Sequence, residues 1–211
     1  MVLANVYGTF FSYSFKPYGQ NKADSFEPIS DNTLTWAAAI GAGVVNGLAR
    51  IVMGAAVDKM GFKKLFTLQA IANLINSLVC CWAVHYPSLY FICILVNFWC
   101  LGGLFSIFPV AVTNVFGLNI GPQIYVWIMF GVFIASLMNL LQTAYLKDMV
   151  GFQALFYMGS VTQILCLVIA YYYEEKLDVD RLRRYGAIVE AKPLSPKSAK
   201  SRETPRGGFG F

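Results

Sequence analysis

The chain has 211 residues, of which 57% are hydrophobic and only 13% are charged, with a formal net charge of +5. Soluble domains carry about 25% charged residues, so this composition excludes an ordinary water-soluble domain and indicates a membrane protein. A transmembrane helix needs about 20 apolar residues, and six segments are candidates, running approximately over 2–17, 34–57, 65–84, 88–112, 122–145 and 152–173. Because they are continuously apolar and lack the alternation of barrel strands, we predict an all-α membrane protein with six transmembrane helices.

The first of these segments, 2–17, is short. Only fourteen residues separate Met1 from Lys16. A signal peptide is disfavoured because no basic region precedes the apolar residues and no small-residue cleavage site follows them. We therefore expect a clipped transmembrane helix, belonging either to a truncated gene model or to a chain that lacks what should come before it.

The second segment carries a cation among small residues. Gly43, Gly47, Arg50 and Gly54 recur at spacings of four, three and four, which places them on one helical face. Asn46 lies one turn before Arg50, on the edge of this face. Gly43 and Gly47 form a small-xxx-small pair that permits close helix contact. The pattern predicts a face turned to protein or to a cavity rather than to lipid.

A charged loop, residues 54–64, follows this face. Its order of residues resembles the signature loop of the major facilitator superfamily: Gly, three residues, Asp, a basic residue, any residue, Gly, then a basic pair. The matching residues are Gly54, Asp58, Lys59, Gly61 and Lys63, and Lys64 adds a further charge. Phe62 departs from the pattern, which usually has a basic residue there. A generic positively charged inner loop is the alternative on this motif alone.

Basic residues set the expected orientation. With the first segment starting inside, three lysines of the loop and nine basic residues of the tail 174–211 lie inside, against three lysines outside. Both termini are therefore predicted to be cytoplasmic. The tail turns to Ser, Pro and Gly and is predicted to be disordered, with a contact to anionic lipids near its start as one use of its charge and a simple positive-inside anchor as the other.

The fourth segment narrows the resemblance. Gly102-Gly103, Phe108-Pro109 and residues 115–117 are similar to the tenth helix of the oxalate/formate antiporter and monocarboxylate transporter branch. The same branch places an Arg four residues before the Gly that opens the signature loop, as Arg50 and Gly54 do here. The resemblance implies the C-terminal half, helices seven to twelve, of a twelve-helix transporter. Oxalate-type relatives also carry a Lys within the fifth segment. This chain has no Lys within that segment, and Lys147 lies just beyond it. The absence argues against a dianion such as oxalate as the substrate.

The resemblance implies a secondary transporter, or half of one, for a small organic anion such as a monocarboxylate, carried with a proton or by exchange. Arg50 would pair with the anion, Asn46 would add a neutral hydrogen bond, and the loop from Gly54 to Lys64 would act as a conformational latch. An N-terminal half or self-association would complete the assembly. The alternative is a truncated or regulatory membrane fragment without transport of its own.

Enzymatic, metal and nucleic-acid functions are not expected. The only histidine, His85, lies at a predicted outer helix end, and no pair of buried carboxylates is evident. The five cysteines form no CxxC or Cys/His spacing and are expected to serve as small apolar residues. We therefore expect no cofactor, and an integral membrane location in which plasma membrane and organelle are equally open.

Overall fold

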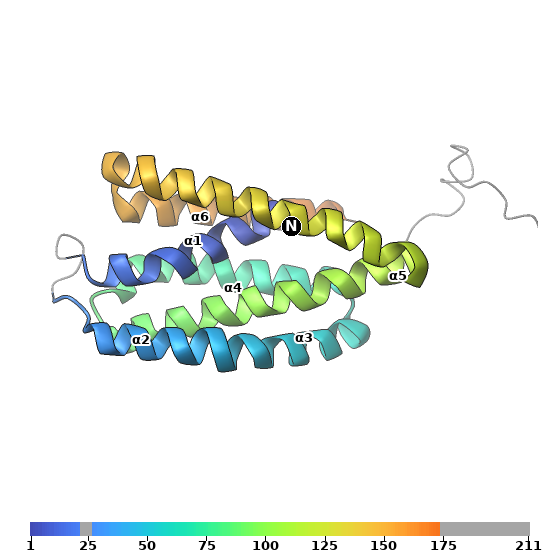
Figure 1. Ribbon diagram of the computed structural model, residues 1–211, viewed down its shortest axis with the longest axis horizontal. Coiled ribbons are helices and arrows are strands. Elements are labelled where there is room, and N and C mark those ends of the chain that lie inside the picture. Colours follow the sequence, from blue (N-terminus) through green and yellow to red (C-terminus); the bar gives the residue numbers. More distant parts are fainter. Residues whose placement is uncertain (22–26, 174–211) are drawn as a thin grey trace, which may run out of the picture. The chain divides into compact units, whose positions relative to one another are not determined.

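Helices make up almost all of the chain that the computed structural model describes, which is residues 1–21 and 27–173, without the side chains of residues 118 and 119. No strand occurs in these residues (Figure 1). The elements in chain order are α1 (Val2–Gly19), α2 (Asp31–Ala39), the π-helix η1 (Ile40–Val45), α3 (Asn46–Met60), α4 (Phe62–Ala83), α5 (Pro87–Leu141), the π-helix η2 (Gln142–Leu146) and α6 (Lys147–Tyr172). The expectation of a disordered basic tail, residues 174–211, lies outside the described residues.

Three glycines with positive φ turn the chain sharply. Gly61 (φ 82°) separates α3 from α4, Gly117 (φ 79°) interrupts α5, and Gly151 (φ 78°) interrupts α6. Residues with a Cβ rarely adopt this backbone conformation, so glycine is the favoured residue at each turn. In Figure 1 the chain reverses direction within α5, where the green part of the helix meets the yellow part. The prolines inside α5, Pro109 and Pro122, do not interrupt its helical dihedral angles.

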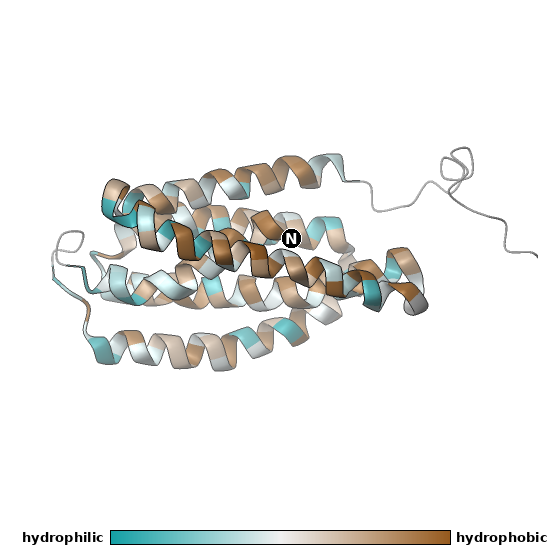
Figure 2. Ribbon diagram, turned by 45° about the horizontal axis from the view of Figure 1, so that its top comes forward, coloured by the Kyte–Doolittle hydropathy of each residue, from teal (hydrophilic) through white to brown (hydrophobic). Residues whose placement is uncertain are grey.

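In the described part of the chain, four helical stretches are long and apolar enough to cross a membrane. They are Asp31–Met60, Phe62–Ala83, Pro87–Gly117 and Ile120–Tyr172. The first joins α2, η1 and α3 without a break, and the last runs through the turn at Gly151. Figure 2 shows hydrophobic colour along the lengths of the helices and hydrophilic colour concentrated towards their ends. This distribution is that of an integral membrane protein.

The interior of the bundle contains polar side chains, while large apolar side chains cover much of its surface. Asn76 donates to the Tyr7 hydroxyl (3.2 Å), and Asn97 donates to the Gly8 carbonyl (3.1 Å). Two further pairs join helices, Asn139 with Thr9, and Ser77 with Ser160. These contacts connect α1 with α4 and α5, and α4 with α6. Apolar lipid gives helices no hydrophobic reason to associate, so close packing and interhelical hydrogen bonds must hold them together.

Buried aromatic rings fill one end of the bundle. Tyr7, Phe11, Tyr18, Tyr90 and Phe156 are almost fully buried and pack ring against ring. Gly159 lies against Tyr7, so α6 approaches α1 closely at this level. The aromatic contacts therefore fix α1 and α6 against the start of α5.

The loop between α1 and α2 is bridged at its base. Lys16 forms an ion pair with Asp31 (2.7 Å), and Gln20 donates to the same carboxylate (2.8 Å). The N-cap of α2 is Ser30, whose hydroxyl accepts from the Thr33 amide (3.3 Å). Asp31 lies in the first turn of α2, where its charge suits the helix dipole.

Candidate functional site

Glycines of α5 allow α3 to lie directly on it. A Cβ on Gly102 would stand 2.5 Å from the backbone oxygen of Asn46, closer than Cβ atoms come to other atoms in proteins. Earlier along the same contact, Gly41 of η1 lies against the ring of Phe98. A Cβ on this glycine would also come too close to its neighbour. Since both close approaches need glycine, these residues fix the depth and register of the α3–α5 contact. The first residue of α3, Asn46, is held there.

Arg50 lies one helical turn further along α3, above a ring of α5. Its Cζ is 5.4 Å from the centroid of Phe105, and its Nε donates to the Asn46 Oδ1 (3.1 Å). The side chain is exposed. Within the described residues its two terminal nitrogens have no hydrogen-bond acceptor and no carboxylate forms an ion pair with it. The guanidinium is thus held from one side and presents its remaining donors outward.

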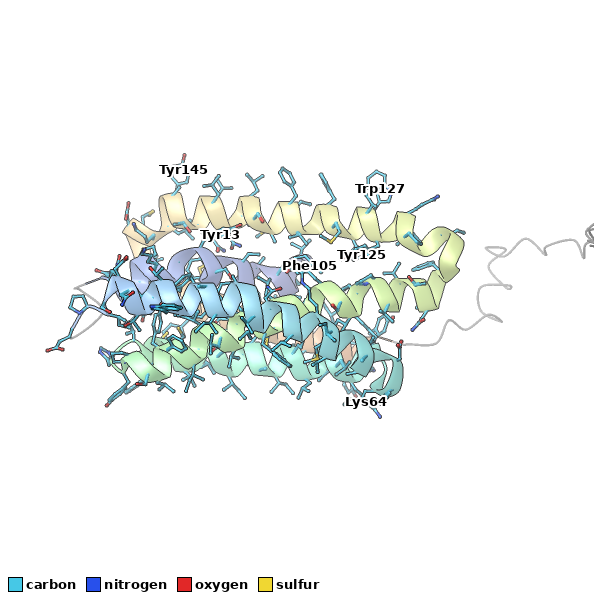
Figure 3. All side chains as sticks on the ribbon, turned by 60° about the horizontal axis from the view of Figure 1, so that its bottom comes forward. Tyr13, Lys64, Phe105, Tyr125, Trp127 and Tyr145 are labelled. Carbon is cyan, nitrogen blue, oxygen red and sulfur yellow. The ribbon has the colours of Figure 1, made fainter. Side chains whose placement is uncertain are left out.

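Tyr125 approaches the same place from the part of α5 beyond Gly117. Its hydroxyl donates to the Phe105 carbonyl over a long 3.4 Å, and the side chain is half-buried. Figure 3 labels both residues, which lie near each other in that view. Arg50 and Tyr125 thus both contact Phe105. Three helical segments thereby bring a cation, an amide, an aromatic ring and a phenol together.

The small-residue pair does not pack within the described part of the chain. A Cβ on Gly43 or Gly47 would meet nothing within 4 Å. Between the helix that carries them and α5, close contacts occur at Gly41 and Gly102 instead. Helix-face periodicity finds the small residues but does not distinguish those that contact a neighbour. Gly43 and Gly47 therefore leave an open surface beside Arg50.

Residues 54–64 end α3 and begin α4. Gly54 faces Ser106 of α5, and a Cβ on this glycine would lie 3.9 Å from the serine Cβ. Asp58 and Lys59 are exposed in the last turn of α3, and Gly61 makes the turn. Lys64 is also exposed at the start of α4. Asp58 lies eight residues from Arg50, about 12 Å along the helix axis, so Arg50 and the charged residues of the loop form two separate groups.

Lys63 connects this loop to the last helix. Its ammonium donates to the carbonyl of Tyr171 (2.8 Å) and to that of Tyr173 (2.9 Å). The final carbonyls of a helix have no partner within it and carry partial negative charge, so a lysine there is favourable. Lys63 therefore places the loop and the end of α6 at the same end of the bundle.

Sequence reasoning brought Asn46 and Arg50 together, but it missed Phe105 and Tyr125. Phe105 follows Gly102 by three residues and so lies on nearly the same face of α5. That spacing was a usable signal. No sequence signal pointed to Tyr125, because this residue comes close to Phe105 only through the reversal of the chain at Gly117. Within the described residues no group of three His, Cys, Asp or Glu side chains is placed to hold a metal ion.

A sequence model of the Major Facilitator Superfamily matches residues 1–206. The chain belongs to this superfamily. Its members are membrane transporters of small molecules, and the all-helical fold with membrane-length apolar helices fits that function. The resemblance to the superfamily drawn from residues 54–64 is thereby confirmed. No curated protein and no solved structure matches the chain.

Proposed function

We propose that this major facilitator chain forms the substrate-binding half of a secondary transporter for a small monocarboxylate. The observation that carries the proposal is Arg50, a cation within an apolar helix, held by Asn46 over Phe105 with its terminal donors unused in the described residues. An Arg near the centre of a membrane helix costs about 2.5–3.5 kcal/mol or more, which favours a partner or a water-filled cavity. A carboxylate supplies that partner, and its two oxygens match the guanidinium fork.

Snorkelling of Arg50 to the membrane surface is the competing explanation. A snorkelling side chain would extend towards the charged loop at residues 58–64. The guanidinium instead bonds to Asn46, which lies four residues earlier in the chain and therefore away from that loop. Its position over Phe105 holds it beside the open surface of Gly43 and Gly47. This geometry favours a binding site within the membrane.

A single positive charge favours a monoanion over a dianion. Lys147, the nearest basic residue at the end of the fifth predicted segment, forms an ion pair with Asp148 (3.6 Å) and lies over the ring of Phe152 (5.7 Å). It is therefore engaged at a helix end rather than offered to substrate. This supports the monocarboxylate branch over oxalate, in line with the absence of any Lys within residues 122–145.

The proposed topology has six membrane crossings, with both termini and residues 58–64 in the cytoplasm. In this topology the turn at Gly117 divides α5 into two crossings, and the turn at Gly151 separates the second of these from the crossing formed by the rest of α6. Lys63 contacts the end of α6, so this end lies beside the loop at Gly61. An even number of crossings between the loop and the end of α6 requires both to lie on the same side of the membrane. The bias of twelve basic residues inside against three outside supplies the direction.

Alternating access in such transporters requires two halves that rock about a central site. The open surface at Gly43 and Gly47 and the exposed guanidinium of Arg50 suit a second half, supplied as an N-terminal half or by self-association. Residues 58–64 would then latch the cytoplasmic side, with Asp58 near a helix N-terminus of the other half. The same open surface supports the second candidate function, a regulatory membrane fragment without transport of its own.

Competition for uptake tests the substrate class. Vesicles containing the assembled transporter should accumulate radiolabelled L-lactate saturably, and acetate and pyruvate should compete with it more strongly than oxalate. Uncharged analogues such as lactamide should compete weakly, because they leave the Arg50 charge unpaired. Uptake that is blocked by amines or sugars and unaffected by monocarboxylates would contradict the proposal.

A further inference from the structure

We infer that Tyr125 is a second anchor for the anion and the residue that selects carboxylates over other monoanions. The inference rests on the proposed function, because it places Tyr125 in the site formed by Arg50. It assigns the phenol hydroxyl to one carboxylate oxygen and the Arg50 guanidinium to the other.

The positions of the three side chains support this assignment. Phe105 contacts Arg50 through its ring face (5.4 Å from Cζ to the centroid) and Tyr125 through its backbone carbonyl (3.4 Å from the phenol oxygen). The guanidinium and the phenol therefore both contact Phe105. The proposed anion lies beside this residue, between the two donors.

The hydrogen bond that Tyr125 makes here is easily replaced. It is long, and its acceptor is a neutral carbonyl of α5. Hydrogen bonds weaken towards 3.5 Å, whereas a bond to a charged acceptor is shorter and about twice as strong as a neutral one. A carboxylate between Arg50 and Tyr125 would therefore draw the phenol proton away from the Phe105 carbonyl. The ring is only half-buried, so its hydroxyl is free to turn towards the anion.

The shape of the anion then matters as well as its charge. Arg50 attracts any monoanion, but the phenol can donate a strong hydrogen bond only to an anion with a second oxygen that points away from the first. A carboxylate meets this requirement. Thiocyanate carries the same charge and accepts hydrogen bonds more weakly, so it should depend on Arg50 and be nearly indifferent to Tyr125.

Tyr145 offers a matched control. It is another tyrosine of the Ile120–Tyr172 stretch, its side chain is 67% exposed, and in Figure 3 it points away from the bundle, as Trp127 does. Tyr125→Phe and Tyr145→Phe each remove one hydroxyl and keep the ring. A general effect of losing a phenol would appear in both variants.

The test measures anion binding without requiring transport. Phenylglyoxal modifies accessible arginines, and mass spectrometry of the Arg50 peptide from the full chain in lipid nanodiscs gives the modification rate of that residue alone. L-lactate should slow the reaction. Tyr125→Phe should raise the lactate concentration that gives half protection by about 10-fold, the effect of one hydrogen bond to a charged group. Thiocyanate protection in Tyr125→Phe, and lactate protection in Tyr145→Phe, should match the parent chain.

The possible outcomes distinguish a failure of the role inferred for Tyr125 from a failure of the proposed anion site. If lactate protects Arg50 equally in the parent chain and in Tyr125→Phe, the anion site stands and the role of Tyr125 is overturned. Equal weakening of lactate and thiocyanate in Tyr125→Phe would also overturn it, because the phenol would then only position Arg50. If lactate fails to protect Arg50 in the parent chain, the proposed anion site is refuted, and the role of Tyr125 is refuted with it.

Discussion

Gly102→Ala tests whether the packing of α3 on α5 builds the site. The added Cβ would stand 2.5 Å from the Asn46 oxygen and 3.1 Å from the Asn46 carbonyl carbon and Cα. All three atoms belong to the backbone, so no side-chain rotation relieves the contact. The separation must grow to the 3.4 Å at which ordinary contact begins, and α3 must move to provide it.

The cost follows from two opposing terms. Overpacking of this kind costs about 1–3 kcal/mol, while replacing a helical Gly by Ala gains about 1 kcal/mol of helix propensity. Gly47→Ala is the matched control, since it has the same propensity gain and its Cβ meets nothing within 4 Å. The difference between the two variants isolates the overpacking, and about 1–3 kcal/mol corresponds to about 2–12 °C for a chain of this size.

Thermal unfolding of the purified chain in detergent measures this difference. Gly47→Ala should unfold at or slightly above the parental temperature, and Gly102→Ala should unfold clearly below Gly47→Ala. The displaced Asn46 and Arg50 should also change the phenylglyoxal reactivity of Arg50 in Gly102→Ala. Equal unfolding temperatures for the two variants would refute the close approach of α3 to α5.

Three further predictions concern topology, the loop and the assembly. Single cysteines introduced at residues 59–64 should react with impermeant reagents from the cytoplasmic side only; labelling from the outside would refute the six-crossing topology. Lys63→Met should speed hydrogen exchange in the last turn of α6 because it removes two donors, while Lys64→Met, which changes an exposed lysine with no described partner, should not; equal exchange in both would count against the Lys63 contact. Residues 1–211 alone should not transport, so saturable uptake by a chain that cross-links as a strict monomer would contradict the requirement for a second half.

The sequence was sufficient for the features that depend on composition and local spacing. Low charge and long apolar stretches predict a helical membrane protein, and the order from Gly54 to Lys63 points to the superfamily. The i to i+4 spacing of Asn46 and Arg50 predicts that their side chains meet, as they do at 3.1 Å. Each of these signals lies within one or two helical turns of chain.

Features that depend on contacts between distant segments could not be predicted in this way. Gly43 and Gly47 have the spacing of a packing motif, yet Gly41 and Gly102 make the close contacts, because the neighbouring helix decides which face is covered. Tyr125 reaches Phe105 only through the reversal at Gly117, and Lys63 reaches the end of α6 across 108 residues. These pairings require the three-dimensional arrangement of the helices.

Transport by Arg50 variants in the completed assembly tests the central claim most directly. Arg50→Ala should insert normally and abolish lactate uptake, because the anion loses its counter-charge. Arg50→Lys should also insert normally but transport poorly, because it keeps the charge and loses the bidentate fork. Uptake at the parental rate by a normally inserted variant that lacks Arg50 would contradict the anion site and leave snorkelling as the explanation of this residue.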